Sequence, residues 1–399
     1  MYVPDQRILR NYAKILIDFA LGSGKGIKPN EVVFLQFDST AMPLAFEVYQ
    51  RILERGAHPM VKIHEEDFSR IFYEHAKDNQ LDFFPEKYQK SLVETIDHRI
   101  YLIAEKDPFL LKDVPPQKLM KGQQGRQMMK KWLFDKEDQG KLTWVLALYG
   151  TAGMASEAGL SLEEFWQQII KACFLDSKNP LKTWQKVFDD LEAIRTRLNA
   201  LTIEKLHVTA KNTDLWVQLG ANRQFMGGSG RNIPSFELFT SPDWRGTEGH
   251  ISFDLPLYRY GNILNDVYLE FKNGHVVKAT ASKNEPLLHE LIKQKNANKI
   301  GEYSLTDKRY SHIDKFMANT LYDENFGGTW GNTHLALGSS YHEAYRGDLK
   351  GMKDKDWEYH GFNESPEHTD IIATTDRTVE ATLQGGVKKI IYEKGQFTV

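Results

Sequence analysis

The stretch EVVFLQFDSTAMPLAFEVYQRILERGAHPMVKIH, residues 31–64, sets the expectation for the fold. It opens with a compact apolar run at 31–38 that is typical of a buried strand, and a second such run follows at 58–64. Between them, residues 42–56 carry apolar side chains at helical spacing and end at Gly56, a common helix terminator. A strand, a helix and a strand in this order predict a βαβ unit whose two strands run parallel.

The same alternation continues through the first half of the chain. Further strands are predicted at 99–105 (RIYLIAE) and 143–150 (TWVLALYG). A helix is predicted at 161–174, where Ser161 and Glu164 form a capping-box pattern. Short apolar strands separated by helices predict an α/β domain, with a parallel sheet and helices on both of its faces.

The pattern changes after about residue 200. Residues 205–220 (KLHVTAKNTDLWVQLG) predict two strands around a polar turn at Asn212, and Asn273-Gly274 predicts a hairpin turn between two further strands. We therefore predict two domains. Residues 1–200 form an α/β N-terminal domain, and residues 201–399 form a β-rich α+β C-terminal domain.

Composition narrows the classes of function. The 399 residues carry a net charge of −3 with histidines neutral, so the chain lacks the positive charge typical of nucleic-acid-binding proteins. No stretch approaches the ~20 apolar residues of a membrane span, and the first residues do not resemble a secretory signal. Cys173 is the only cysteine, which excludes a disulfide within the chain and a cysteine-based zinc site. We expect a cytoplasmic protein without nucleic-acid or membrane partners.

Near the C-terminus, SPEHTDII (365–372) places a histidine and a carboxylate two residues apart. Alternate side chains of a strand point to one face, so His368 and Asp370 are expected to point together, with Cβ atoms roughly 6–7 Å apart. One divalent ion between them, or one ion bound by each, is compatible with this spacing. The alternative for this segment by itself is an ion-paired strand end exposed to solvent.

Three further segments carry candidate ligands. His334 precedes an apolar alternation and lies ten residues after Glu324, across a glycine-rich connection that allows the chain to fold back. Glu237 and Glu302 both neighbour apolar residues, where a carboxylate must be paired, protonated or bound to a metal. For each of these residues by itself, a structural or solvated role is the alternative.

Together the segments offer four carboxylates and two imidazoles: Glu237, Glu302, Glu324, Asp370, His334 and His368. This set of oxygen and nitrogen donors suits two divalent ions such as Zn²⁺, Co²⁺ or Mn²⁺. Two such ions about 3.5–4 Å apart can share a bridging water, lower its pKa and polarise a carbonyl group. The residues by themselves leave open whether the six converge.

The order of four motifs resembles the thermophilic-type metalloaminopeptidases, the family of aminopeptidase T, aminopeptidase S and aminopeptidase II. The motifs are NIPSFELFTSP, IGEYSL, DEN…THLALGSSY and EHTDII, and the resemblance covers essentially the whole chain. It implies two divalent ions per subunit, held by the six residues named above. It also implies that Glu302 is the general base that acts on the bridging water, and that Tyr341 hydrogen-bonds the developing oxyanion.

The resemblance further implies a homodimer whose active sites face an enclosed space, and short peptides with a free N-terminus as substrates. It makes residues 201–399 the metal-binding catalytic domain. The expected activity is hydrolysis of N-terminal residues by a metalloaminopeptidase. Two alternatives stay open: a different two-metal amidohydrolase, and a non-catalytic peptide-binding protein on the same scaffold.

Overall fold

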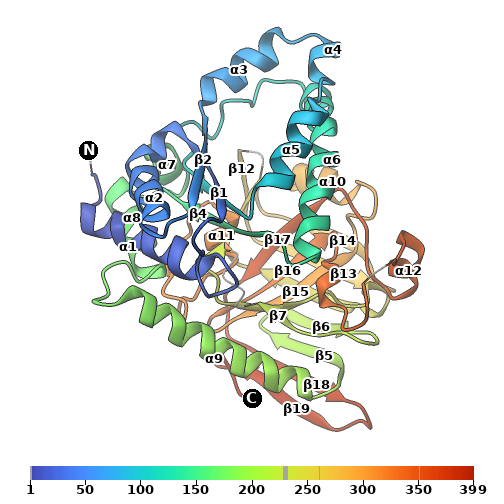
Figure 1. The fold of residues 1–399 in the computed structure, drawn as a ribbon. Helices are drawn as coiled ribbons and strands as arrows, with labels where there is room; N and C mark the ends of the chain where they lie inside the picture. Colours follow the sequence, from blue (N-terminus) through green and yellow to red (C-terminus); the bar gives the residue numbers. More distant parts are fainter. Residues whose placement is uncertain (1, 228–231, 260, 350) are drawn as a thin grey trace. The chain divides into compact units, whose positions relative to one another are not determined.

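The structure, a computed structural model, describes residues 2–227, 232–259, 261–349 and 351–399. The described residues group into two compact units (Figure 1). The first runs to Gln185 and includes residues 232–234, and the second comprises residues 186–227 and the described residues from Ser235 onward. The boundary predicted near residue 200 falls at the end of helix α9 (Pro180–Ala200). No described helix is both long enough and apolar enough to cross a membrane.

The first unit is built on a five-stranded parallel sheet in the order β2-β1-β3-β4-β8. The α/β class predicted from residues 31–64 is confirmed, because β1 and β2 pair in parallel and α2 connects them. The strands are β1 (Val32–Asp38), β2 (His58–His64), β3 (His98–Ile103), β4 (Thr143–Leu148) and β8 (Asn232–Ile233). The α-helices before α9 are α1 (Gln6–Ile15), α2 (Met42–Glu54), α3 (Glu66–His75), α4 (Asp78–Leu81), α5 (Glu86–Thr95), α6 (Pro116–Asp138), α7 (Ala152–Glu157) and α8 (Leu162–Ala172).

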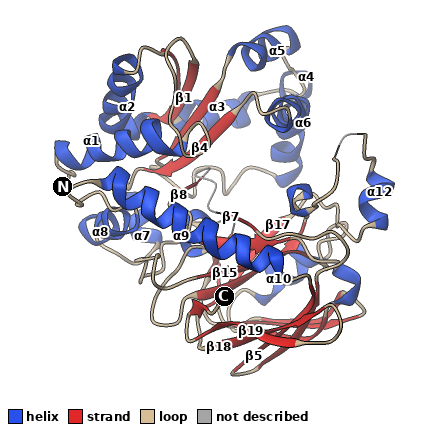
Figure 2. Ribbon diagram, turned by 60° about the horizontal axis from the view of Figure 1, so that its bottom comes forward, coloured by secondary structure: helices blue, strands red, loops and turns tan. Residues whose placement is uncertain are grey.

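Strand order explains how helices cover this sheet. Strand β2 lies on one side of β1 and β3 lies on the other, so the chain reverses its direction across the sheet after β2. Right-handed crossovers then place the connecting helices on opposite faces. Figure 2 shows α2 and α6 on opposite sides of strands β1 and β4. As a result β1 is buried almost throughout.

The sheet ends at β2, most of whose residues are exposed. The His58 N–H donates to the carbonyl oxygen of Glu31, at 2.8 Å, so the backbone donors alternate from there along the strand. The nitrogen of Pro59 therefore faces the free edge, and it carries no hydrogen.

The second unit is β-rich, as predicted, and its strands all pair antiparallel. An eight-stranded sheet has the order β14-β13-β10-β6-β5-β18-β19-β20, and a five-stranded sheet has the order β17-β16-β15-β9-β7. The strands are β5 (Ile203–Ala210), β6 (Thr213–Gln218), β7 (Met226–Gly227), β9 (Glu237–Thr240), β10 (Glu248–Phe253), β11 (Leu257–Arg259), β12 (Asn262–Leu264), β13 (Val267–Lys272), β14 (His275–Thr280), β15 (Ile300–Thr306), β16 (Asn332–Gly338), β17 (His368–Ala373), β18 (Arg377–Leu383), β19 (Lys388–Glu393) and β20 (Gln396–Phe397). Its short helices are α10 (Glu285–Ile292), α11 (Thr320–Asp323) and α12 (Asp354–Tyr359).

Both predicted polar turns are present. Asn212 joins β5 to β6 with a φ of 55°. Asn273 and Gly274, with φ of 49° and 76°, join β13 to β14, and positive φ at both central residues is the signature of a tight hairpin turn.

The five-stranded sheet has two chemically different faces. One face contributes to the hydrophobic core of the unit through Leu238, Tyr303, Leu305, Leu335, Leu337, Ile371 and Ala373. The alternate residues point to the other face and include Glu237, Glu302, His334, His368 and Asp370. The strand register brings these residues close together. Ser304 of β15 lies opposite His334 of β16, and Ala336 of β16 lies opposite Asp370 of β17.

Strands β16 and β17 make a close backbone approach at Gly338, which pairs with His368. Gly338 has a φ of 110°, a conformation that favours glycine, and a Cβ atom built there would lie 2.1 Å from the carbonyl oxygen of Glu367. The carbonyl oxygen of Gly338 also accepts a hydrogen bond from Asn363 Nδ2 at 2.6 Å. Glycine at this position therefore fixes where β17 begins.

We predict that Gly338→Ala destabilises the protein more than Gly385→Ala does. Gly385 also has a left-handed φ, of 87°, but a Cβ atom there meets nothing within 4 Å, so its substitution costs only the backbone strain of about 1–2 kcal/mol. Gly338→Ala adds the displacement of Glu367. Chemical denaturation followed by circular dichroism measures both losses, and equal losses would contradict the close approach.

Candidate metal centre

The polar face of the five-stranded sheet holds Glu302 at its centre. Its side chain is buried, with the residue only 3% exposed. A bulge between Ile300 and Glu302 shifts the register of β15 against β16, and such bulges re-aim side chains. A Cβ atom on Gly301 would lie 2.2 Å from the carbonyl oxygen of Ser339, so glycine allows β15 to pass close to the end of β16. Below, "the cluster" means Glu237, Glu302, Glu324, His334, His368 and Asp370.

Glu237, Glu302 and His334 form a first group of potential ligands, whose donor atoms lie within 4.8 Å of one another. The Nε2 atom of His334 lies 3.1 Å from Glu237 Oε2 and 3.1 Å from Glu302 Oε1. The hydroxyl of Ser304 donates to Glu237 Oε2 at 2.9 Å and fixes this carboxylate. The three side chains come from β9, β15 and β16, so one ion at this point would join three strands.

Glu302, His368 and Asp370 form a second group. The Nε2 atom of His368 lies 3.5 Å from Glu302 Oε2 and 3.4 Å from Asp370 Oδ1. Its Nδ1 atom lies 2.9 Å from the carbonyl oxygen of Ser339. A carbonyl oxygen only accepts, so Nδ1 carries a hydrogen and Nε2 is the nitrogen available to a metal. Glu302 thus belongs to both groups, through Oε1 in the first and Oε2 in the second.

Glu324 reaches the cluster from the end of α11. The neighbouring Asn325 accepts a hydrogen bond from the Phe236 N–H at 2.6 Å and donates to the carbonyl oxygen of Leu321 at 3.1 Å. These bonds tie the loop to the residue that precedes Glu237. Glu324 belongs to neither ligand group, but the charges of Glu237 and other cluster carboxylates act on it.

Tyr341 lies beside the cluster and is far more open than the carboxylates, with 45% of the residue exposed. Its ring contacts those of His368 and Phe239, with centroids 4.9 Å and 5.6 Å away. Desolvation of the hydroxyl and the negative charges of Glu302 and the other cluster carboxylates raise its pKa well above 10. The hydroxyl therefore stays protonated and can donate a hydrogen bond.

The cluster concentrates negative charge in a buried place. Burial is the largest cause that raises the pKa of Glu302, to about 7, and of Glu324, well above its usual value. Burial by itself would lower the pKa of His368, but the charge of Asp370 raises it to about 9. The raised pKa values favour bound protons, which offset the crowded carboxylates. A divalent cation supplies the same compensation, and carboxylate and imidazole donors are its usual ligands, so the residues present fit such an ion.

The structure brings all seven residues named from the sequence to this one place. Five of them make up the two ligand groups, and Glu324 and Tyr341 border those groups. Among the described residues, His334 Nδ1 has no hydrogen-bond partner, so the orientation of this ring depends on its Nε2 side and on packing.

Sequence reasoning missed three supporting residues. Ser304 lies two positions after Glu302, so strand periodicity pointed to it. Asn325 stands next to Glu324 in the DEN motif, but its role depends on a contact with a residue 89 positions away. Ser339 acts through its backbone carbonyl, which side-chain chemistry does not signal.

Comparisons with known proteins show which sequences and which fold this chain resembles. Aminopeptidase PepS of Streptococcus thermophilus is 27% identical to this chain over 98% of both chains. Aminopeptidase T of Thermus aquaticus is 26% identical over 74% of this chain and 76% of its own. The solved structure of wild-type AmpT from Thermus thermophilus has the same fold, with a TM-score of 0.84, 22% sequence identity, and coverage of 99% of this chain and 100% of that one.

A family model supplies the assignment. The model described as thermophilic metalloprotease (M29) matches residues 5–397, which is nearly the entire chain and includes both units. Members of a metalloprotease family are hydrolases that depend on a metal ion. The chain therefore belongs to the thermophilic metalloprotease (M29) family.

Proposed function

We propose that this chain is an aminopeptidase that hydrolyses N-terminal residues from short peptides, with two divalent ions held by the cluster. The observation that carries the proposal is the position of Glu302 between two ligand groups, one at each of its oxygens. The relatives named aminopeptidases, similar over nearly the whole chain, support the same activity. A homodimer and a cytoplasmic location stay predictions from the sequence and the family resemblance.

Membership of a metalloprotease family implies a divalent metal, and the number and identity of the ions belong to the proposal. Glu237, Glu302 and His334 would hold one ion, and Glu302, His368 and Asp370 would hold a second. We place Glu324 at the edge of these groups as a further ligand. Zn²⁺, Co²⁺ or Mn²⁺ bound here would lower the pKa of a water molecule and polarise the substrate carbonyl.

Tyr341 supplies the hydrogen bond to the oxyanion in this proposal. Its raised pKa keeps the hydroxyl protonated, and its exposed position leaves it within reach of a substrate. A donor that faces developing negative charge from a fixed position stabilises the transition state more than the ground state.

Two buried glutamates can accept a proton at this site. The family resemblance assigns proton transfer to Glu302, and this is our proposal. Glu324 is the competing candidate, because it stands outside both ligand groups and burial raises its pKa.

We propose that selectivity for a free N-terminus comes from coordination to a metal ion. Two divalent ions would offset the four carboxylates of the cluster, so an unprotonated α-amine would bind through its lone pair. An N-acetylated peptide has no such amine, because the lone pair of its amide nitrogen is delocalised. We therefore place the substrate α-amine at the cluster and the scissile carbonyl beside Tyr341.

Removal of metal is expected to abolish hydrolysis. Purified protein treated with a chelator should lose its activity toward aminoacyl amides, and addition of Co²⁺ or Zn²⁺ should restore that activity. Metal analysis of the same samples gives the number of ions bound per chain. N-acetylated versions of the same substrates are the control and should not be cleaved. Hydrolysis by a verified metal-free sample would refute the metal dependence, and cleavage of the blocked substrates would favour a different amidohydrolase.

The variants Glu302→Gln and Glu324→Gln separate the two candidates for the proton acceptor. Loss of a general base lowers kcat by roughly 10²–10⁴-fold, and we expect this loss in Glu302→Gln measured at saturating metal, since the substitution also removes the charge of a residue common to both ligand groups. We expect a smaller loss in Glu324→Gln. Steady-state kinetics, with metal analysis of the same samples, compares the two losses of kcat. A larger loss in Glu324→Gln would assign the role of proton acceptor to Glu324.

Asn325 is expected to matter for metal affinity although it is not a ligand. Asn325→Ala removes the bond to the Phe236 N–H and frees the Glu324 loop, which should weaken binding in a competition titration with a chromophoric chelator. Asn11→Ala is the matched control, because Asn11 is also buried and hydrogen-bonded, to Leu175 O at 2.7 Å in the first unit. Each change should lower the free energy of unfolding by about 1–3 kcal/mol. Equal metal affinity in both variants would contradict the role of Asn325.

A further inference from the structure

Strands β16 and β17 are joined by a long excursion that begins at Tyr341. The described part of residues 341–363, called the bracket segment here, contains α12 and a 3₁₀ turn at His342–Ala344. It has a small core of its own, formed by Ala344, Trp357 and Phe362. The His342 ring stacks on Trp357 with centroids 3.8 Å apart. Tyr341 is therefore attached at its C-terminal side to a segment with a packed core of its own.

Arg223 fastens this body to the rest of the unit. Its Nη2 atom donates to the carbonyl oxygen of His360 at 2.6 Å, and its guanidinium lies over the Phe362 ring, 3.7 Å from the centroid. Its backbone forms a bridge with Tyr345. The adjacent Gln224 N–H donates to the carbonyl oxygen of Ala344 at 2.9 Å. The Arg223 side chain thus contacts the end of the bracket segment, and the backbone of Arg223 and Gln224 contacts its beginning.

The same side chain reaches the residue that holds Tyr341. Arg223 Nε donates to the carbonyl oxygen of Ser241 at 2.6 Å. The Ser241 side chain, which is fully buried, accepts a hydrogen bond from the backbone N–H of Tyr341 at 2.8 Å. Two hydrogen bonds therefore connect Arg223 with the backbone of Tyr341, through a serine that follows strand β9.

Arg223 is committed to these contacts. The residue is 8% exposed, and its remaining nitrogen, Nη1, donates to the carbonyl oxygen of Ala221 at 3.2 Å. Burial lowers the pKa of the guanidinium to about 10, because its charged form has protein partners in place of water. Three carbonyl oxygens and an aromatic face meet its planar donors, an arrangement that lysine cannot reproduce.

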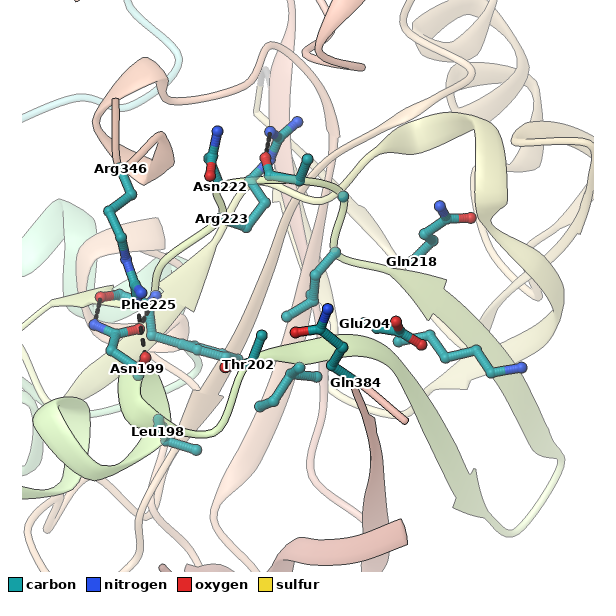
Figure 3. A pocket seen from close by; sticks show the side chains of 15 residues that line it. Leu198, Asn199, Thr202, Glu204, Gln218, Asn222, Arg223, Phe225, Arg346 and Gln384 are labelled. Atoms are coloured by element: carbon teal, nitrogen blue, oxygen red, sulfur yellow. Dashed lines mark hydrogen bonds between the residues drawn. The ribbon is translucent and has the colours of Figure 1, made fainter. Parts of the chain in front are cut away.

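The loop that carries Arg223 borders a hollow of about 640 Å³. Figure 3 shows Asn222, Arg223 and Phe225 beside it, with Asn199 and with Arg346 of the bracket segment. In it Arg346 Nη2 donates to Asn199 O at 2.8 Å. The loop is also held by Asn199, which exchanges two hydrogen bonds with the backbone of Phe225, at 2.7 and 3.0 Å.

We propose that Arg223 is a positioning residue for Tyr341: it sets the place of the tyrosine through Ser241 and through the bracket segment. This inference rests on the proposed function, in which the Tyr341 hydroxyl supports the reaction. Misplacement of a catalytic donor by about 1 Å costs roughly 10²-fold in rate. The effect of Arg223 on turnover is therefore expressed through Tyr341 alone.

A double-mutant cycle tests this with the metal-loaded enzyme and an aminoacyl amide substrate. Arg223→Met should lower kcat by roughly 10- to 100-fold with KM changed less than about twofold. In the Tyr341→Phe background, the same substitution should lower kcat by less than about twofold, because the hydroxyl is already gone. If the kcat losses of Arg223→Met and Tyr341→Phe multiply in the double variant, the proposal is overturned, since that result indicates that Arg223 supports the fold in general.

Two further variants keep the test decisive if Arg223→Met folds poorly. Ser241→Ala removes only the acceptor of the Tyr341 N–H and should show the same lack of additivity with Tyr341→Phe. Arg309→Met is the control arginine, because Arg309 binds Asp307 and the carbonyl oxygen of Phe397 in the same unit without contact to the bracket segment. It should lower the melting temperature without coupling to Tyr341→Phe, and coupling of equal size would contradict the specific role of Arg223.

Hydrogen–deuterium exchange gives a readout that does not depend on the reaction. Peptides that cover residues 339–345 should exchange at least about tenfold faster in Arg223→Met and Ser241→Ala than in wild type. Their exchange rate should be unchanged in Arg309→Met. If the wild type fails to hydrolyse any aminoacyl amide, the proposed function fails while exchange still decides whether Arg223 positions Tyr341. Unchanged exchange in Arg223→Met would overturn the positioning role.

Discussion

The two-residue period of a β-strand is the constraint on which the metal centre depends. In strands β15, β16 and β17, every second side chain enters the hydrophobic core, and the side chains between them form the polar face. Leu335 beside His334 and Ile371 beside Asp370 illustrate the division. A shift of one residue would exchange the two faces, so packing of the core also holds the ligands in register.

That register is then secured where backbones meet. Gly301 and Gly338 lie where the strands approach so closely that no side chain fits, and the bulge before Glu302 turns its carboxylate toward both imidazoles. The carbonyl oxygen of Ser339 selects the hydrogen position on His368. Buried charge is compensated in two ways: the carboxylate of Glu302 lies beside two imidazoles, and Arg223 donates to carbonyl oxygens.

Much of the fold could be predicted from the sequence because its signals are local. The strand–helix–strand pattern of residues 31–64 gave the parallel sheet, and Asn273-Gly274 gave a hairpin. The pair His368 and Asp370 could be placed on one face by strand spacing, but by itself it could not be told from an exposed strand end. The remaining site residues were assigned from the family resemblance, which the order of the four motifs carries. Asn325, Ser241 and Arg223 act through contacts with residues distant in the sequence, which local patterns do not encode.

The free edge of the parallel sheet has a consequence for behaviour in a crowded solution. Strand β2 exposes Met60, Val61 and Ile63, and an apolar edge strand is a template on which a second chain can extend the sheet. Pro59 offers no N–H at that edge, so an incoming strand would leave one of its carbonyl oxygens without a partner. A single imino acid thus makes sheet extension, and the aggregation that follows from it, less favourable while the strand keeps its parallel partner β1.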